Sequence, residues 1–367
     1  MADRVLVTGA TGFIAQHCIV QLLESGYFVR GTARSPGGGA GVASVLEPHL
    51  SSAARERLGD DFEVVAADLT SDEGWHSAVE GCRFVLHVAS PLPSAPPKDA
   101  QDLIVPARDG ALRVLRAASE RGVERVVMTS SMAAICYGRE RDHLFTEDDW
   151  SNVDGPHIGA YEQSKTIAER SAWEFMTSLG AQSTMDLVTI NPGLVLGPLL
   201  CAEWSTSAEL IKKILQRAVP AIPDARFAMV DVRDVAAAHV AAMLSPEASG
   251  QRFICCIESH AIREVAMILK VEFGPRGFKV PTRALALPVL RFVALWDRQA
   301  RLLMADVGRP ALLDNSKIRR VFGIEFRDLR EMTVSMADSM IRYGVVRAKR
   351  GRTAVKQPEV IAGDQDL

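Results

Sequence analysis

The 367-residue sequence lacks a strong charge of either sign, and it lacks an apolar run long enough to cross a bilayer. Its formal net charge is -3 and its pI is about 6.3, so charge gives no reason to expect nucleic acid or a membrane as the main partner. The apolar residues Val5 to Val7 before the first glycine turn are too few for a secretory signal. The stretch 284–296 is apolar but is interrupted by Pro288 and Arg291, which favours a packed or interfacial helix. We therefore expect a cytoplasmic protein.

The sequence also lacks a cysteine or histidine pattern with metal-ligand spacing, and it has no internal repeat. Its six cysteines are scattered, and the adjacent pair Cys255 and Cys256 has no matching ligands nearby in the sequence. Reduced thiols and no metal site are expected. The remaining cysteines are Cys18, Cys82, Cys136 and Cys201.

Apolar, β-branched segments alternate with helical patterns through the first half of the chain, and several of these segments are apolar on both faces. Both properties are typical of a doubly wound α/β fold, in which helices cover the two faces of a parallel sheet. The predicted strands are 4–8, 28–32, 62–66, 84–88, 125–129 and 186–190. The predicted helices are 14–25, 103–121 and 161–178.

Regular alternation fades after Asn191-Pro192-Gly193, which suggests a second, smaller unit. We expect a Rossmann-type core over 1–193, rejoined by about 230–257 with a late strand at 251–257. A smaller C-terminal substrate-binding lobe would comprise 194–229 and 258–343, followed by a mobile tail at 344–367. Three loops are predicted at 37–41, 90–97 and 139–157, the first of them glycine-rich and flexible.

A glycine-rich turn follows the first predicted strand and precedes a helix, which is where dinucleotide folds bind phosphate. Gly9 allows a tight turn, Gly12 lets a pyrophosphate approach the backbone, and Ala15 is the third small residue. The spacing is G-x-x-G-x-x-A rather than the better-known G-x-G-x-x-G.

The end of the second predicted strand carries no acidic residue, where NAD-binding proteins place one against the ribose. Arg34 stands there instead, and a guanidinium can form paired hydrogen bonds with a 2′-phosphate, which favours NADP over NAD. After the third strand, Asp68 can accept a hydrogen bond from adenine while Leu69 covers the ring, although a lone Asp is often a turn or helix cap.

Tyr161 and Lys165 are four residues apart, so a helix places them on one face. A tyrosine can donate a proton to a carbonyl oxygen, and a nearby ammonium is expected to lower its pKa. The run Thr129-Ser130-Ser131 lies between the glycine turn and this pair, at the end of an apolar strand. Together these three features indicate a nicotinamide-dependent oxidoreductase.

The same residues resemble the extended short-chain dehydrogenases/reductases, and within them the group of dihydroflavonol reductases, cinnamoyl-CoA reductases and aldehyde (methylglyoxal) reductases. The motifs that carry the resemblance span residues 5 to about 325. They are 7–15, 68–70, 85–91, 129–131, Tyr161-Glu162-Gln163-Ser164-Lys165, Asn191-Pro192-Gly193, 231–236 and 314–317.

The resemblance implies a catalytic set of Ser131, Tyr161 and Lys165. Ser131 would orient the carbonyl, Tyr161 would donate the proton, and Lys165 would also bind the nicotinamide ribose. His87 is interpreted as a buried structural residue. The residues implied to contact NADP are Gly9, Thr11, Gly12, Phe13, Ile14, Arg34, Asp68, Leu69, Val88, Ala89, Ser90, Thr129, Tyr161, Lys165, Pro192, Gly193 and Val195.

Cys136 stands where plant dihydroflavonol reductases carry Asn or Asp, which counts against a flavonoid substrate, and Arg113 stands where many relatives carry a polar amide. The expected pocket is largely apolar, with Leu92, Met132, Ile135, Cys136, Trp204 and Met229 as candidate lining residues. We expect an NADPH-dependent reductase of an aldehyde or ketone with an apolar body, acting as a monomer or homodimer. The alternatives are a hydroxysteroid dehydrogenase, a nucleotide-sugar epimerase or dehydratase, and a regulator that binds NADP without turnover.

Overall fold

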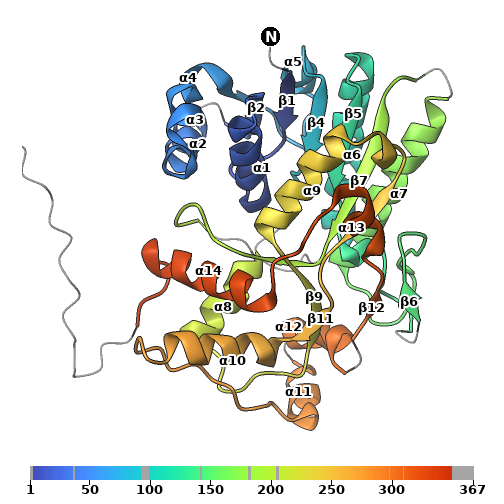
Figure 1. The fold of residues 1–367 in the computed structure, drawn as a ribbon. Coiled ribbons are helices and arrows are strands. Elements are labelled where there is room, and N and C mark those ends of the chain that lie inside the picture. Colours follow the sequence, from blue (N-terminus) through green and yellow to red (C-terminus); the bar gives the residue numbers. More distant parts are fainter. Residues whose placement is uncertain are drawn as a thin grey trace, which may run out of the picture.

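The chain forms a large sheet with helices on both faces and a smaller lobe beside it (Figure 1). The structure is a computed structural model. It describes residues 3–35, 38–91, 99–140, 143–180, 183–203, 206–296, 298–308 and 310–348.

The large sheet has seven strands in the order β10-β7-β5-β4-β1-β2-β3, and every neighbouring pair is parallel. Because β1 lies between β2 and β4, the strand order reverses there, and such a reversal opens a ligand crevice at the carboxyl ends of the strands. The strands are β1 (Arg4–Val7), β2 (Phe28–Ala33), β3 (Phe62–Ala66), β4 (Phe84–His87), β5 (Arg125–Thr129), β7 (Asp186–Pro192) and β10 (Arg252–Cys255). The predicted fold class is confirmed.

Alternate residues of the strands face different cores, which is why these strands read as apolar on both faces. Val5 and Val7 of β1 pack in one cluster with α1 and α9, whereas Leu6 packs in the other with α5, α6 and α7. These helices are α1 (Phe13–Glu24), α5 (Trp75–Val79), α6 (Gln101–Glu120), α7 (Ala160–Ser178) and α9 (Val232–Leu244).

A third apolar cluster fills the smaller lobe, drawn in the lower half of Figure 1. Here β9 (Arg226–Asp231) pairs in parallel with β8 (Leu194–Leu196) and antiparallel with β11 (Ser259–Ala261). The accompanying helices are α8 (Thr206–Leu215), α10 (Ile262–Phe273), α11 (Leu287–Val293), α12 (Arg298–Leu303) and α14 (Leu329–Arg342). The further elements are α2 (Gly38–Leu46), α3 (Ser52–Glu56), α4 (Leu58–Asp61), α13 (Ser316–Phe322) and the paired strands β6 (Leu144–Phe145) and β12 (Leu312–Leu313).

Residues 38–41 of the glycine-rich segment after β2 differ from their prediction as a flexible loop, and Gly37 lies outside the described residues. Helix α2 begins at Gly38, inside that segment. The C-terminal part of this helix is anchored by Val42 and Leu46, which are buried in the same cluster as α1. This packing outweighs the low helix propensity of the glycines at its start.

Candidate active site

The glycine turn after β1 is shaped by close contact with the end of β4. Gly9 has φ +71°, and a Cβ atom on it would lie 3.0 Å from the Cβ of Ala89. Its amide donates to Thr32 Oγ1 at 3.0 Å, while Thr8 Oγ1 accepts from the Ala89 amide at 2.9 Å. The turn therefore needs glycine at position 9, both for its backbone conformation and for its neighbour.

Helix α1 begins immediately after this turn, with Gly12 as its N-cap and no side-chain cap. The first amides of a helix have no partner within it, and the positive end of the helix dipole lies at the same place. These amides belong to Phe13, Ile14 and Ala15. A Cβ on Gly12 would come within 3.1 Å of the Gly9 carbonyl oxygen. The turn thus fits the pyrophosphate of a dinucleotide.

Arg34 and Asp68 follow β2 and β3, which are neighbours in the sheet. Arg34 is exposed just beyond β2, and its charge is one of those that lower the pKa of Asp68. The larger cause is Thr70, which donates to Asp68 Oδ1 from its amide at 2.8 Å and from its hydroxyl at 2.7 Å. One carboxylate oxygen of Asp68 therefore caps a turn, as a lone Asp often does.

The segment 88–90 follows β4, half-buried beside the glycine turn. His87, just before it, is buried, and its Nδ1 lies 3.0 Å from Thr8 Oγ1. Burial lowers the pKa of His87 to about 3, with the charge of Lys165 acting in the same direction. His87 is thus a neutral, hydrogen-bonded residue that stands near Lys165.

The two serines after β5 face different surroundings. The Ser130 hydroxyl donates to Glu169 Oε2 at 2.5 Å in the protein interior. Ser131 instead lines a pocket together with Tyr161, and its oxygen accepts from the Ala133 amide at 3.1 Å. The Thr129 hydroxyl is 2.6 Å from His239 Nε2 on α9, so it ties the strand to that helix.

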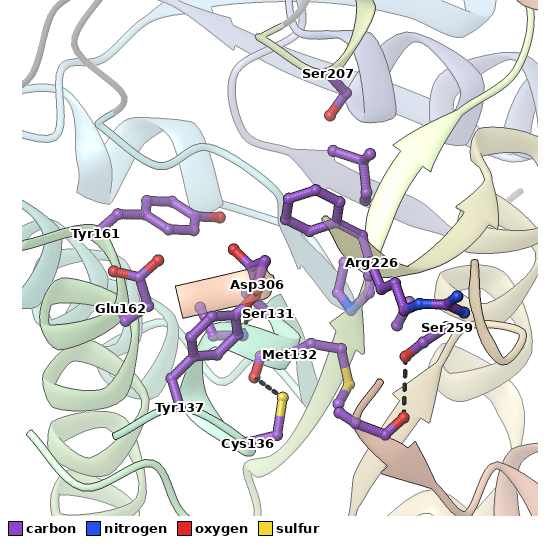
Figure 2. Close-up of a pocket in the computed structure, with 17 residues that line it drawn as sticks. Ser131, Met132, Cys136, Tyr137, Tyr161, Glu162, Ser207, Arg226, Ser259 and Asp306 are labelled. Atoms are coloured by element: carbon purple, nitrogen blue, oxygen red, sulfur yellow. Dashed lines mark hydrogen bonds between the residues drawn. The ribbon is translucent and has the colours of Figure 1, made fainter. Parts of the chain in front are cut away.

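Tyr161 lies in the first turn of α7 and points into the pocket in Figure 2. Burial raises its pKa, a side-chain hydrogen bond with Ser131 lowers it, and the neighbouring Glu162 carboxylate raises it again. The net direction is upward, so the expectation that Lys165 would lower this pKa is wrong for this structure. Desolvation of the phenolate, together with the adjacent acid, outweighs the hydrogen bond with Ser131, and Lys165 is not among the causes of the shift.

Lys165 lies one turn further along α7 and is buried. Burial lowers its pKa to about 8, and the charge of Glu169 acts against this shift. An ammonium with such a pKa gains and loses a proton near neutrality. The pKa of Lys165 therefore lies nearer to neutrality than that of an exposed lysine.

The pocket beside these residues has a volume of about 260 Å³ and is lined by both halves of the molecule (Figure 2). Two predicted substrate-pocket residues, Met132 and Cys136, line it, as do Pro192 and Gly193. The other lining residues are Ser131, Ala133, Tyr137, Tyr161, Glu162, Leu194, Ser207, Arg226, Phe227, Ala228, Ser259, Asp306 and Ala311.

Several other predicted residues do not reach this pocket. Ile135 is fully buried in the cluster that contains α1, and Met229 is fully buried in the lobe cluster. Val195 lies in β8 opposite Val230 and is buried. Leu92 and Trp204 lie outside the described residues.

Sequence reasoning missed the charged and polar residues that the pocket gathers from distant segments. The Tyr137 hydroxyl donates to Asp306 Oδ1 at 2.9 Å, and Glu162 Oε2 accepts from the Gly159 amide at 2.9 Å. Burial raises the pKa of Glu162, and so does the charge of Asp306. The acid at the third helical position of α7 could have been found as a helix-capping signal, whereas Asp306 and Arg226 have no motif around them.

A buried network behind the pocket holds α7 against the sheet. The carboxylate of Glu169, one turn after Lys165, accepts from Asn191 Nδ2 at 2.8 Å and from Arg252 Nε at 2.7 Å. Asn191 also donates to the Ser131 carbonyl oxygen at 3.2 Å. The Arg252 guanidinium stacks 3.8 Å from the centre of the Trp150 ring. The backbone of Ser131 and the carboxylate of Glu169 are thus connected through Asn191.

The described segments contain neither a metal-binding cluster nor a membrane-spanning helix. No cluster of three or more His, Cys, Asp or Glu side chains there could hold a metal ion. No helix in the same segments has the length and apolar character needed to cross a membrane.

A doubly wound parallel sheet with a phosphate-binding glycine turn after its first strand defines a Rossmann-type dinucleotide-binding protein. Within this class, the chain belongs to the NAD dependent epimerase/dehydratase family, which its sequence matches over residues 5–256. The predicted resemblance to the extended short-chain dehydrogenases/reductases is confirmed.

Individual relatives resemble the chain over most of its length. Cinnamoyl-CoA reductase 1 of Petunia hybrida is 38% identical over 350 residues, which are 93% of this chain and 92% of the relative. The structure of the yeast methylglyoxal/isovaleraldehyde reductase Gre2 complexed with NADPH matches with a TM-score of 0.75 at 27% identity, covering 93% of this chain and 99% of that one. The Candida albicans Gre2 complex with NADPH gives 0.76 and 28%, with the same coverage.

Proposed function

We propose that the protein is an NADPH-dependent reductase that converts a small aldehyde or ketone to an alcohol. The observation that carries this proposal is the meeting of Ser131 and Tyr161 in one pocket, with Lys165 one helical turn behind them. The volume of about 260 Å³ is at the small end of ligand pockets, which favours a compact substrate.

The cofactor assignment is supported by the fit of the glycine turn and by Arg34. The uncapped start of α1 and the two glycines would hold the pyrophosphate. Arg34 would pair with the 2′-phosphate that distinguishes NADP from NAD. Both Gre2 structures named above contain NADPH. When bound, the cofactor would supply the hydride.

The protein's own residues would handle the carbonyl oxygen. Ser131 and Tyr161 would both hydrogen-bond to it, which stabilises the negative charge that develops there. Tyr161 would then transfer its proton to the oxygen. The upward direction of its pKa favours the protonated phenol, and Lys165, whose pKa is lowered to about 8, would return a proton to the phenolate afterwards and regain one from solvent.

The pocket and its residues favour this proposal over two of its alternatives, the hydroxysteroid dehydrogenase and the regulator. Apolar groups are present at Met132, Leu194 and Phe227, as expected, but acids and an arginine stand among them. A steroid would need a larger apolar surface than a cavity of about 260 Å³ gives. The presence of both Tyr161 and Lys165 favours a catalyst over a regulator that only binds NADP.

The decisive experiment combines a substrate screen with a tyrosine variant. NADPH oxidation is followed with a panel of small aldehydes and ketones, for the native protein and for Tyr161→Phe. We expect the variant to lose about 10²- to 10⁴-fold in kcat, which is the usual contribution of a positioned proton donor, while NADPH affinity measured by fluorescence is unchanged. Tyr343→Phe removes a hydroxyl that lies 3.1 Å from His49, away from the pocket, and serves as the control. Near-native turnover by Tyr161→Phe would refute the assignment of the proton donor. A panel without any NADPH oxidation would refute the reductase proposal.

A further inference from the structure

We propose that the pocket contains an anion subsite at Arg226, so that the preferred substrate is a carbonyl compound with a carboxylate at the end remote from the carbonyl. This inference rests on the proposed function, because it takes Ser131 and Tyr161 as the place of the carbonyl. The sequence predicted a substrate with an apolar body, whereas this proposal adds a carboxylate at the end remote from the carbonyl.

Strand β9 contributes three consecutive residues to the pocket wall, namely Arg226, Phe227 and Ala228. Residues 226 and 228 of β9 share one face of the strand because side chains alternate, and Ser259 of β11 pairs directly with Ala228. All three line the cavity. In Figure 2, Arg226 and Ser259 lie across the cavity from Tyr161.

The charge of Arg226 is only loosely matched by protein carboxylates. Within the described segments its one ion-pair contact is with Asp224, where Nε and Oδ1 are 3.8 Å apart and the acid's side chain is 63% exposed. Its charge also acts on Glu264, whose two oxygens accept from the Ala261 amide and contact His260. A guanidinium can form paired hydrogen bonds with a carboxylate, and this one has donors left for a ligand.

Two serine hydroxyl groups that line the same pocket differ in what they can add to an anion site. Ser259 Oγ donates its proton to the Ala311 carbonyl at 2.9 Å, so it is already engaged. Ser207, at the start of α8, also lines the cavity. Its hydroxyl points toward the interior of the pocket in Figure 2 and can donate to an anion.

The opposite wall carries two acidic side chains and no arginine or lysine among the described residues that line it. Asp306 accepts from the Tyr137 hydroxyl, and Glu162 accepts from the Gly159 amide, beside Tyr161. A substrate carboxylate placed there would meet two acids, whereas at Arg226 it would meet a cation. The distribution of charge therefore favours one orientation, with the carbonyl at Tyr161 and the anion at Arg226.

The test compares substrates that differ only in the remote charge. 4-Formylbenzoate and 4-formylbenzamide have similar size, and 4-oxobutanoate and 4-oxobutanamide give a shorter, flexible pair. We expect the native protein to prefer the carboxylates, with a KM for them that rises with salt. Arg226→Gln should lower kcat/KM for the carboxylates about 10- to 100-fold, mainly through KM, as loss of a charged hydrogen bond implies, and should change the amides less than about twofold. Arg226→Lys should restore part of the preference, and Arg283→Gln, at an exposed position of the same lobe, is the control.

The proposed subsite is overturned if the native protein uses acids and amides equally, or if Arg226→Gln weakens both alike. Calorimetry with the product-like anion 4-(hydroxymethyl)benzoate and its amide gives a second readout that needs no turnover. Selective loss of anion binding in Arg226→Gln would support the subsite even if no carbonyl were reduced, which would refute only the proposed function. Equal binding of anion and amide by the native protein would refute the subsite.

Discussion

The two walls of the pocket differ in how firmly their charged groups are held. Behind Ser131, the Glu169 and Arg252 side chains are buried, 2.7 Å apart and bonded to further polar groups. Across the pocket, Arg226 is half-buried, and its acidic neighbour stands 3.8 Å away. The first arrangement fixes geometry, whereas the second leaves a charge available to a ligand. Arg34, exposed beyond β2, resembles Arg226 in this respect.

Because Glu169 and Arg252 are buried behind Ser131, the fold is stable there only when both partners are present. Desolvation alone would raise the pKa of Glu169, but the charge and hydrogen bonds of Arg252, with those of Ser130 and Asn191, lower it below its ordinary value. Removing one member of such a pair leaves a charge in the interior without compensation. A loosely paired arginine at the pocket edge carries no comparable penalty.

The largest effect is expected from breaking the buried pair. Arg252→Met should destabilise the fold by about 3–5 kcal/mol, because Glu169 would lose its main compensating charge. Urea unfolding followed by circular dichroism measures the change. Arg83→Met is the control, since Arg83 bonds Asp3 and Glu124 at the exposed surface. If both variants lost the same free energy of unfolding, the buried pair would be no more important for stability than the exposed pairs of Arg83.

An intermediate effect is expected at the cofactor end. Arg34→Ala should weaken NADPH binding about 10- to 100-fold, the range for a lost charged hydrogen bond, and should leave NADH binding nearly unchanged. Fluorescence titration with both cofactors gives the ratio. Arg121→Ala, which removes an exposed arginine 3.6 Å from Glu80, is the matched control. The interpretation of Arg34 fails if the two cofactors lose affinity equally.

The smallest effect is expected at Asp224, on the side of the pocket that the smaller lobe forms. Asp224→Asn removes the acid beside Arg226 and should lower KM for 4-formylbenzoate by up to about fivefold, because an exposed pair is worth at most about 1 kcal/mol. The amide substrate is the internal reference. A higher KM for 4-formylbenzoate in Asp224→Asn would show that Asp224 positions Arg226 instead of competing with the ligand.

Sequence predicted the large sheet well because its strands and their helices carry local periodic signals. The predicted helix over 161–178 is α7 with one added residue at its start, and the late strand predicted at 251–257 contains β10. The glycines after β2 misled because packing of Val42 and Leu46, which local propensity does not report, decides that segment.

The candidate site was only partly predictable for the same reason. Ser131, Tyr161 and Lys165 belong to short motifs, so they can be recognised before the chain is folded. Arg226, Ser259 and Asp306 come together through strand pairing and through a short turn in the lobe. These residues are far apart in the sequence, and no local pattern predicts that they line the same pocket. The upward pKa shift of Tyr161 likewise depends on burial, which spacing alone does not reveal.

The pair of Glu169 and Arg252 also has a consequence for synthesis on the ribosome. The two residues are 83 positions apart, so the carboxylate emerges long before its cation. Until β10 is translated and joins the edge of the sheet, Glu169 has no cation to pair with, and burying its carboxylate beneath α7 is unfavourable. Completion of the pocket wall around Ser131 therefore waits for a strand encoded late in the message, and a nascent chain that stalls before Arg252 carries Tyr161 and Lys165 without the fold that positions them.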